Sequence, residues 1–106
     1  MNGQVNNRSS RELWVVRKDD GPAIAYKLAP GHRSPEDVDA DGFRAVDGTP
    51  VDGHIAWVKI IDLSTANVED DGSSLTRGCL LCKDVGDQEF GDISYDDSPG
   101  WGELLG

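Results

Sequence analysis

Apolar residues are densest in residues 54–63, HIAWVKIIDL. In a strand, successive side chains point to opposite faces of the sheet, and here both faces would be largely apolar. A strand with one face in water would alternate apolar and polar residues, so we expect this strand to be central in its sheet and buried on both faces. A helix would fit the length, but Ile, Val and Trp favour a strand and no capping residue precedes His54.

Two shorter apolar runs, residues 13–17 and 23–29, flank an Asp20-Gly21 pair. Because Asp-Gly is a strong turn signal, these runs are predicted to form a β-hairpin, with Pro22 just outside the paired residues. The remaining short apolar runs predict further strands, at residues 43–46, 75–82 and 88–95.

The segment from Ser34 to Gly42 has the signals of a short helix. Ser34 is a capping residue, Pro35 suits the first helical position, and the two carboxylates that follow suit the positive end of the helix dipole. Gly42 would end this helix after about two turns. Residues 64–71 are polar, and we expect a loop or one helical turn there.

The two ends of the chain differ from its middle. Residues 1–10 are polar and lack periodicity, which predicts a flexible N-terminal arm. In residues 97–106, Trp101, Leu104 and Leu105 have the spacing of one helical face. Two glycines weaken a free helix there, so this tail is expected to dock on a surface, either its own domain or a partner's groove.

These elements predict one mostly β domain, of the α+β class, over residues 11–106. A chain of 106 residues supports a single modest core. We expect a small antiparallel sheet or a partly open barrel of about five to six strands, with one short helix.

Charge is distributed unevenly along the chain. Residues 1–60 contain 8 Lys and Arg against 9 Asp and Glu, a net charge of −1, whereas residues 61–106 contain 2 against 11, a net charge of −9. This excess opposes binding to nucleic acid or to an anionic membrane and favours a basic partner or a cation. The simpler interpretation is an acidic surface that only keeps the protein in solution.

We therefore expect a non-catalytic acidic protein that binds and inhibits a basic, nucleic-acid-binding protein such as a nuclease. Its carboxylates would imitate the phosphates of a nucleic acid, and a few aromatic side chains would anchor the contact. Small acidic proteins of this kind include phage-encoded inhibitors of host nucleases or CRISPR complexes (anti-CRISPR proteins) and toxin-immunity proteins, an analogy of size and charge with no shared motif. The residues expected to contact the partner are Glu69, Asp70, Asp71, Asp87, Glu89, Asp92, Tyr95, Asp96, Asp97 and Trp101.

A metal-binding module is the alternative. Residues 37–42, DVDADG, resemble the first half of an EF-hand calcium loop, in which carboxylate oxygens bind the cation and glycine permits a sharp turn. The pattern then departs from the EF-hand, because Arg44 stands at the eighth position and Gly48 at the twelfth, where a bidentate carboxylate belongs. If the protein is instead a metal-binding module, the ligands would be Asp37, Asp39 and Asp41. For the preferred interpretation, a non-catalytic binding protein, we expect no cofactor.

The cysteines and histidines supply the ligand types of a tetrahedral zinc site, with Cys79 and Cys82 joined by His32 and His54. Two leucines separate the cysteines, however, and a strand there would send the two thiols to opposite faces, so buried free cysteines are the simpler interpretation. No motif of a catalytic nucleophile accompanies the histidines, and we do not expect an enzyme.

The N-terminus has no apolar run of the signal-peptide kind, and no segment approaches the roughly 20 apolar residues of a membrane span. We expect a cytoplasmic protein, in the host cytoplasm if it is phage-encoded. A structural or assembly component whose tail docks on a neighbouring subunit is a further possibility.

Overall fold

A computed structural model describes residues 3–18, 21–51, 57–60, 64–70 and 83–105, and for residues 83, 84, 87 and 99–101 it describes the backbone. The strands of these ranges are β1 (Gln4–Asn7), β2 (Leu13–Arg17), β3 (Ala23–Leu28), β4 (His32–Arg33), β5 (Gly42–Ala45), β6 (Trp57–Lys59), β7 (Thr65–Val68), β8 (Lys83–Val85), β9 (Ile93–Trp101) and β10 (Glu103–Leu104). One 3-10 helix, η1 (Asp87–Glu89), precedes β9.

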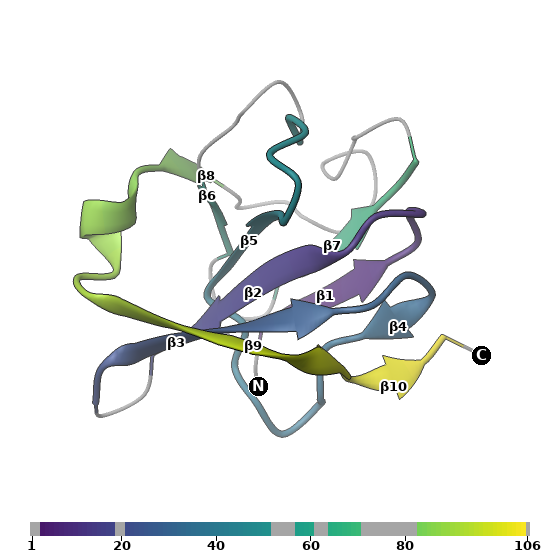
Figure 1. The fold of residues 1–106 in the computed structure, drawn as a ribbon, viewed down its shortest axis with the longest axis horizontal. Helices are drawn as coiled ribbons and strands as arrows, with labels where there is room; N and C mark the ends of the chain where they lie inside the picture. Colours follow the sequence, from purple (N-terminus) through teal and green to yellow (C-terminus); the bar gives the residue numbers. More distant parts are fainter. Residues whose placement is uncertain (1–2, 19–20, 52–56, 61–63, 71–82, 106) are drawn as a thin grey trace.

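The strands form two sheets (Figure 1). The smaller sheet has the order β10-β4-β1-β7, and the larger has the order β8-β6-β5-β2-β3-β9. Most neighbouring strands are antiparallel, whereas β1 with β7 and β3 with β9 are parallel. The mostly β fold class is thus confirmed, and the strands are divided between two mixed sheets.

The larger sheet is apolar on both faces. In β2, Leu13 and Val15 belong to a cluster of buried side chains from both sheets, which therefore lies between the two sheets. Trp14 and Val16 of the same strand belong to a second cluster on the opposite face of the larger sheet. We call these the inner core and the outer cluster. The inner core consists of Val5, Leu13, Val15, Tyr26, Leu28, Ala40, Phe43, Ala45, Val51, Val58, Ile60, Ala66 and Val68. The outer cluster consists of Trp14, Val16, Ala23, Ala25, Trp57 and Phe90.

The predicted strand within residues 54–63 is present as β6, and the residues on either side, 54–56 and 61–63, lie outside the described part. β6 lies between β5 and β8. Trp57 is buried in the outer cluster and Val58 in the inner core, which confirms that this strand is covered on both faces.

The predicted hairpin is also present. β2 and β3 pair antiparallel from Leu13 with Leu28 to Arg17 with Ile24, and Pro22 lies outside the pairing. β5 then pairs with β2 on its other side. A turn follows β5, where Gly48 has a φ of 81° and its N–H donates to the Ala45 carbonyl oxygen at 3.2 Å. The predicted strand at 75–82 lies outside the described residues.

The N-terminal segment differs from the flexible arm that its polar composition predicts. Residues 4–7 form β1, which lies between β4 and β7 in the smaller sheet. Val5 is fully buried in the inner core, and Asn7 is fully buried as well. The side chain of Asn7 makes four hydrogen bonds, which is why a polar residue can occupy this interior position.

The segment 34–42 forms a turn and not the predicted helix. Ser34 is buried, and its hydroxyl accepts a hydrogen bond from the Val5 N–H at 2.8 Å instead of capping a helix. A single turn follows, in which the Val38 N–H donates to the Pro35 carbonyl oxygen at 3.2 Å. Asp39 then accepts the Gly3 N–H at 2.7 Å. The capping and acidic side chains are thus used to hold the N-terminal strand.

Two further predictions need correction. Residues 65–68 are a strand, β7, and not a loop or a helical turn, because pairing with β1 lets Ala66 and Val68 enter the inner core. The strand predicted at 88–95 begins only at Ile93: η1 precedes it, and Gly91 has a φ of 73° in the intervening turn.

The C-terminal segment joins the two sheets (Figure 1): β9 lies beside β3, and β10 lies beside β4. Between them, Gly102 has a φ of 106°, and a Cβ at this position would lie 2.2 Å from the Arg33 carbonyl oxygen. Only glycine suits this conformation and this close approach. Residues 97–104 of the tail therefore pair with the strands of their own domain. The predicted helical face is wrong, because each sheet offers this segment a strand to pair with.

Candidate functional site

The strand β9 ends the strand order of the larger sheet in the described part of the chain. Tyr95, Asp96 and Asp97 on this strand, and Asp92 directly before it, are four of the residues expected to contact a partner. We call these four residues the acidic edge. Asp92, Tyr95 and Asp97 are exposed and Asp96 is half-buried. Part of the site that the sequence predicts therefore lies along β9 and the residue directly before it.

Tyr95 is held in a fixed position although its side chain is 41% exposed. Its ring lies edge-on to Trp14, with the centroids 4.9 Å apart and an interplanar angle of 75°. Arg44 Nη2 donates a hydrogen bond to the Tyr95 hydroxyl oxygen at 3.0 Å. The same guanidinium lies 5.0 Å from the centroid of the Trp57 ring. An exposed aromatic ring that is already immobilised loses little conformational entropy when a partner covers it.

The two carboxylates that follow Tyr95 have different environments. The Ser98 N–H donates to Asp96 Oδ1 at 2.9 Å. Hydrogen bonds from the side chain and the backbone of Ser98 hold the pKa of Asp96 below its usual value, so Asp96 is ionised at neutral pH. Asp97 forms an ion pair with Lys27 at 3.6 Å, but 82% of the Asp97 side chain is exposed. Such a surface pair contributes at most about 1 kcal/mol, and a partner's cation can replace Lys27.

The other predicted contact residues are placed elsewhere. Glu69 and Asp70 follow β7 of the smaller sheet, where Glu69 lies 3.7 Å from Arg8 and Asp70 accepts the Ser10 N–H at 2.6 Å. Glu89, on η1, forms an ion pair with Lys59. The predicted residues thus form separate groups rather than one surface. Asp71 and the side chains of Asp87 and Trp101 lie outside the described part.

The structure does not assemble the predicted calcium ligands. Asp39 accepts the Gly3 N–H, Asp41 accepts the Lys18 N–H at 2.7 Å, and Asp37 is exposed. Among the described residues, no three or more His, Cys, Asp and Glu side chains are arranged to hold a metal ion. Of the residues considered for zinc, His32 has its Nδ1 3.0 Å from the Pro30 carbonyl oxygen, and His54, Cys79 and Cys82 are not described.

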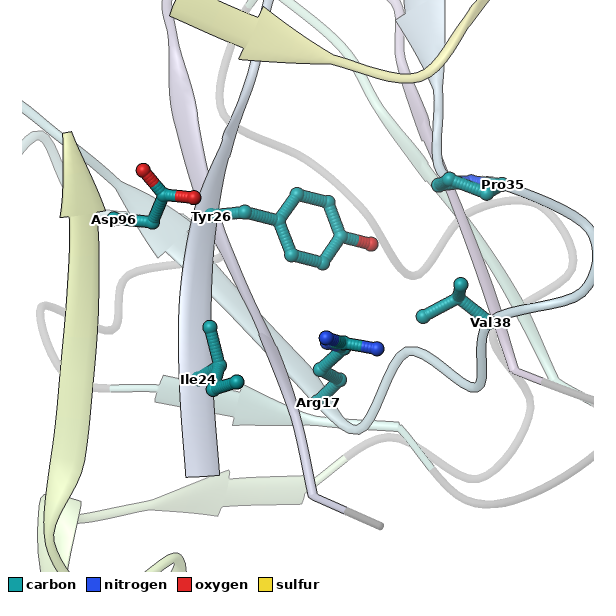
Figure 2. Close-up of a pocket in the computed structure, with 6 residues that line it drawn as sticks. All are labelled: Arg17, Ile24, Tyr26, Pro35, Val38 and Asp96. Carbon is teal, nitrogen blue, oxygen red and sulfur yellow. The ribbon is translucent and has the colours of Figure 1, made fainter. Parts of the chain in front are cut away.

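A pocket of about 120 Å³ lies on the inner side of the same sheet (Figure 2). Its apolar walls are Ile24 on β3 and two residues of the turn after β4, Pro35 and Val38. Figure 2 shows the Tyr26 hydroxyl and the Arg17 guanidinium directed toward that turn. Asp96 completes the lining and comes from β9, on the opposite side of the Tyr26 ring. Burial raises the pKa of Tyr26, so its phenol stays protonated and can donate a hydrogen bond.

The sequence did not identify this pocket. Its strand residues, Arg17, Ile24 and Tyr26, belong to the predicted hairpin, and the period of two places Ile24 and Tyr26 on one face. The missing information was the position of Pro35 and Val38, which were expected in a helix and instead form a turn against that face.

No protein-family model, no curated protein and no solved structure matches this chain. Helices with the length and apolar character needed to cross a membrane are absent from the described residues.

Proposed function

We propose that this protein is a non-catalytic binding protein that attaches through its acidic edge to the basic surface of a nucleic-acid-binding protein and blocks that surface. The observation that carries the proposal is Tyr95, an exposed aromatic ring fixed by Trp14 and Arg44 on a strand that also presents carboxylates. Tyrosine is one of the residue types that most often dominate the binding energy of protein interfaces.

The total charge supports a basic partner even though several acidic residues form ion pairs within the protein. The chain has 20 Asp and Glu against 10 Lys and Arg, so at least ten carboxylates stay uncompensated if every basic residue neutralises one. A field of this sign accelerates encounter with a cationic surface and opposes encounter with nucleic acid. A surface adapted to phosphates is cationic, and occupying it with carboxylates would exclude its nucleic acid.

The experiment is displacement of labelled oligonucleotides from a panel of purified basic DNA- and RNA-binding proteins, including nucleases. We expect the protein to displace the oligonucleotide from its target, and we expect combined Asp92→Lys, Asp96→Lys and Asp97→Lys substitutions to abolish displacement. The matched control, Glu12→Lys with Glu36→Lys and Asp37→Lys, changes the net charge equally at exposed positions off the acidic edge. Equal losses in both variants would show that net charge alone acts, which would rule out the acidic edge as the contact surface.

Tyr95→Ala tests the anchor without changing the charge. We expect it to weaken binding by about 2 kcal/mol, because the fixed ring would fill the centre of the contact. A variant that binds as well as the wild type would remove the observation on which the proposal rests.

A further inference from the structure

The pocket beneath the turn at Pro35–Val38 has chemistry that the proposed function does not use. We propose that it binds a small monocarboxylate with a branched aliphatic or single-ring body. The carboxylate would accept hydrogen bonds from Arg17 and Tyr26, and the body would lie against Ile24, Pro35 and Val38. The pocket shares Asp96 with the acidic edge, but the groups proposed to contact the ligand, Arg17, Tyr26, Ile24, Pro35 and Val38, lie outside that edge.

The size of the pocket sets the size of the ligand. Its volume is about 120 Å³. A protein cavity of about 150 Å³ lined by apolar side chains holds benzene, so the apolar body here has about four to six carbons. Ile24, Pro35 and Val38 supply the apolar surface that such a body would cover. Larger ligands would have to move the turn.

The polar groups determine which end of the ligand is charged. Arg17 offers a planar set of N–H donors that suits a carboxylate, and Tyr26 offers an O–H donor that burial keeps protonated. Figure 2 shows both groups on the side of the pocket near Val38. Asp41 also acts electrostatically on Tyr26, and its carboxylate accepts the Lys18 N–H.

Asp96 makes the two ends of the pocket electrostatically different. It lines the pocket from β9, on the other side of the Tyr26 ring from Pro35 (Figure 2). A second carboxylate beside Asp96 would be repelled, whereas one beside Arg17 would be attracted. The geometry therefore favours an anion beside Arg17 over one beside Asp96.

The experiment is a titration of the full chain, labelled with ¹⁵N, with 3-methylbutanoate and with benzoate, followed by NMR. We expect saturable shifts of the amide signals of Ile24, Tyr26 and Val38. The neutral amide 3-methylbutanamide keeps the shape and removes the charge, and it should bind roughly tenfold more weakly or worse. No saturable shift up to roughly 20 mM carboxylate, or equal binding of the amide, would overturn the proposal.

Substitutions locate the site. Arg17→Met keeps most of the side-chain volume and should weaken carboxylate binding roughly tenfold, whereas Arg17→Lys should retain part of the affinity. If Arg17→Met fails to fold, Val38→Trp provides the second test, because an indole at this wall would fill the pocket and abolish binding. Thermal unfolding of each variant verifies that it is folded. Unchanged binding in a folded Arg17→Met or Val38→Trp variant would place the ligand elsewhere and refute the inference.

Discussion

The clearest structural prediction concerns Asn7, a fully buried polar residue in a segment whose sequence suggests a disordered arm. Its Nδ2 donates to the Arg11 carbonyl oxygen at 2.8 Å and to the Leu28 carbonyl oxygen at 3.0 Å. Its Oδ1 accepts hydrogen bonds from the N–H and the hydroxyl of Ser9, at 3.1 and 2.6 Å. One side chain thus connects β1 with β3 and holds the connection between β1 and β2.

Asn7→Ala removes all four of these hydrogen bonds. Each contributes about 1 kcal/mol net, and buried groups left without a partner add to the loss, so we expect a decrease of about 3 to 5 kcal/mol in the free energy of unfolding. Domains of this size are stable by about 5 to 15 kcal/mol in total. The variant should therefore be severely destabilised, with a melting temperature lower by at least about 12 °C.

Urea denaturation followed by circular dichroism measures this difference, and Asn6→Ala is the matched control. Asn6 is the preceding residue of the same strand, is half-buried, and donates one hydrogen bond to Asn67 Oδ1 at 2.9 Å. Its replacement should reduce the free energy of unfolding by about 1 kcal/mol or less. Equal small losses in the two variants would refute the placement of Asn7 inside the fold and favour the flexible arm.

Two further predictions concern the close approach at Gly102 and the response to acid. Gly102→Ala should destabilise the fold by more than about 2 kcal/mol in urea denaturation, because the added Cβ would overlap the Arg33 carbonyl. The control, Gly31→Ala, should lose only about 1 kcal/mol, because Gly31 has a similar φ of 76° but open space around it. Equal losses in the two variants would contradict the close contact at Gly102. Hydrogen bonds from Thr49 and Ser98 lower the pKa values of Asp47 and Asp96, so the folded state binds protons less readily than the unfolded state. Their contribution is present above the unfolded pKa of about 3.9 and is lost as the pH falls through the folded values. The free energy of unfolding of an Asp47→Asn, Asp96→Asn variant should therefore fall less steeply than that of the wild type below about pH 4; parallel curves would contradict the pKa directions.

The sequence predicted the larger sheet better than the smaller one, for a physical reason. β2, β3 and β6 have runs of apolar residues because both faces of the larger sheet are covered. The strand β1 has the composition of a loop, because Asn7 is buried through hydrogen bonds and its neighbours Gln4 and Asn6 lie at half-exposed positions. β7 has only Ala66 and Val68 as apolar residues. The local pattern of apolar residues therefore predicts strands that are buried by hydrophobic packing. It misses strands that are stabilised by pairing with residues far away in the sequence.

The candidate site, too, depends on contacts between residues that are far apart in the sequence. Tyr95 was predicted as an anchor from its position among carboxylates, but nothing local shows that Trp14 and Arg44, far away in the chain, fix its ring. The helix signals at Ser34 were misleading, because a serine that can cap a helix can equally accept the N–H of a distant strand. The pocket depends on that turn, so it was missed together with it.

The most direct test of the central claim is the salt dependence of binding to a basic target found in the displacement panel. Exposed charges are screened beyond about 8 Å at physiological ionic strength, so an electrostatic contact weakens as salt is added. We predict that the association constant falls at least tenfold between about 50 and 300 mM salt, with a smaller slope for the variant reversed at Asp92, Asp96 and Asp97. An association constant that is independent of salt would contradict the proposal that this protein recognises its partner by charge.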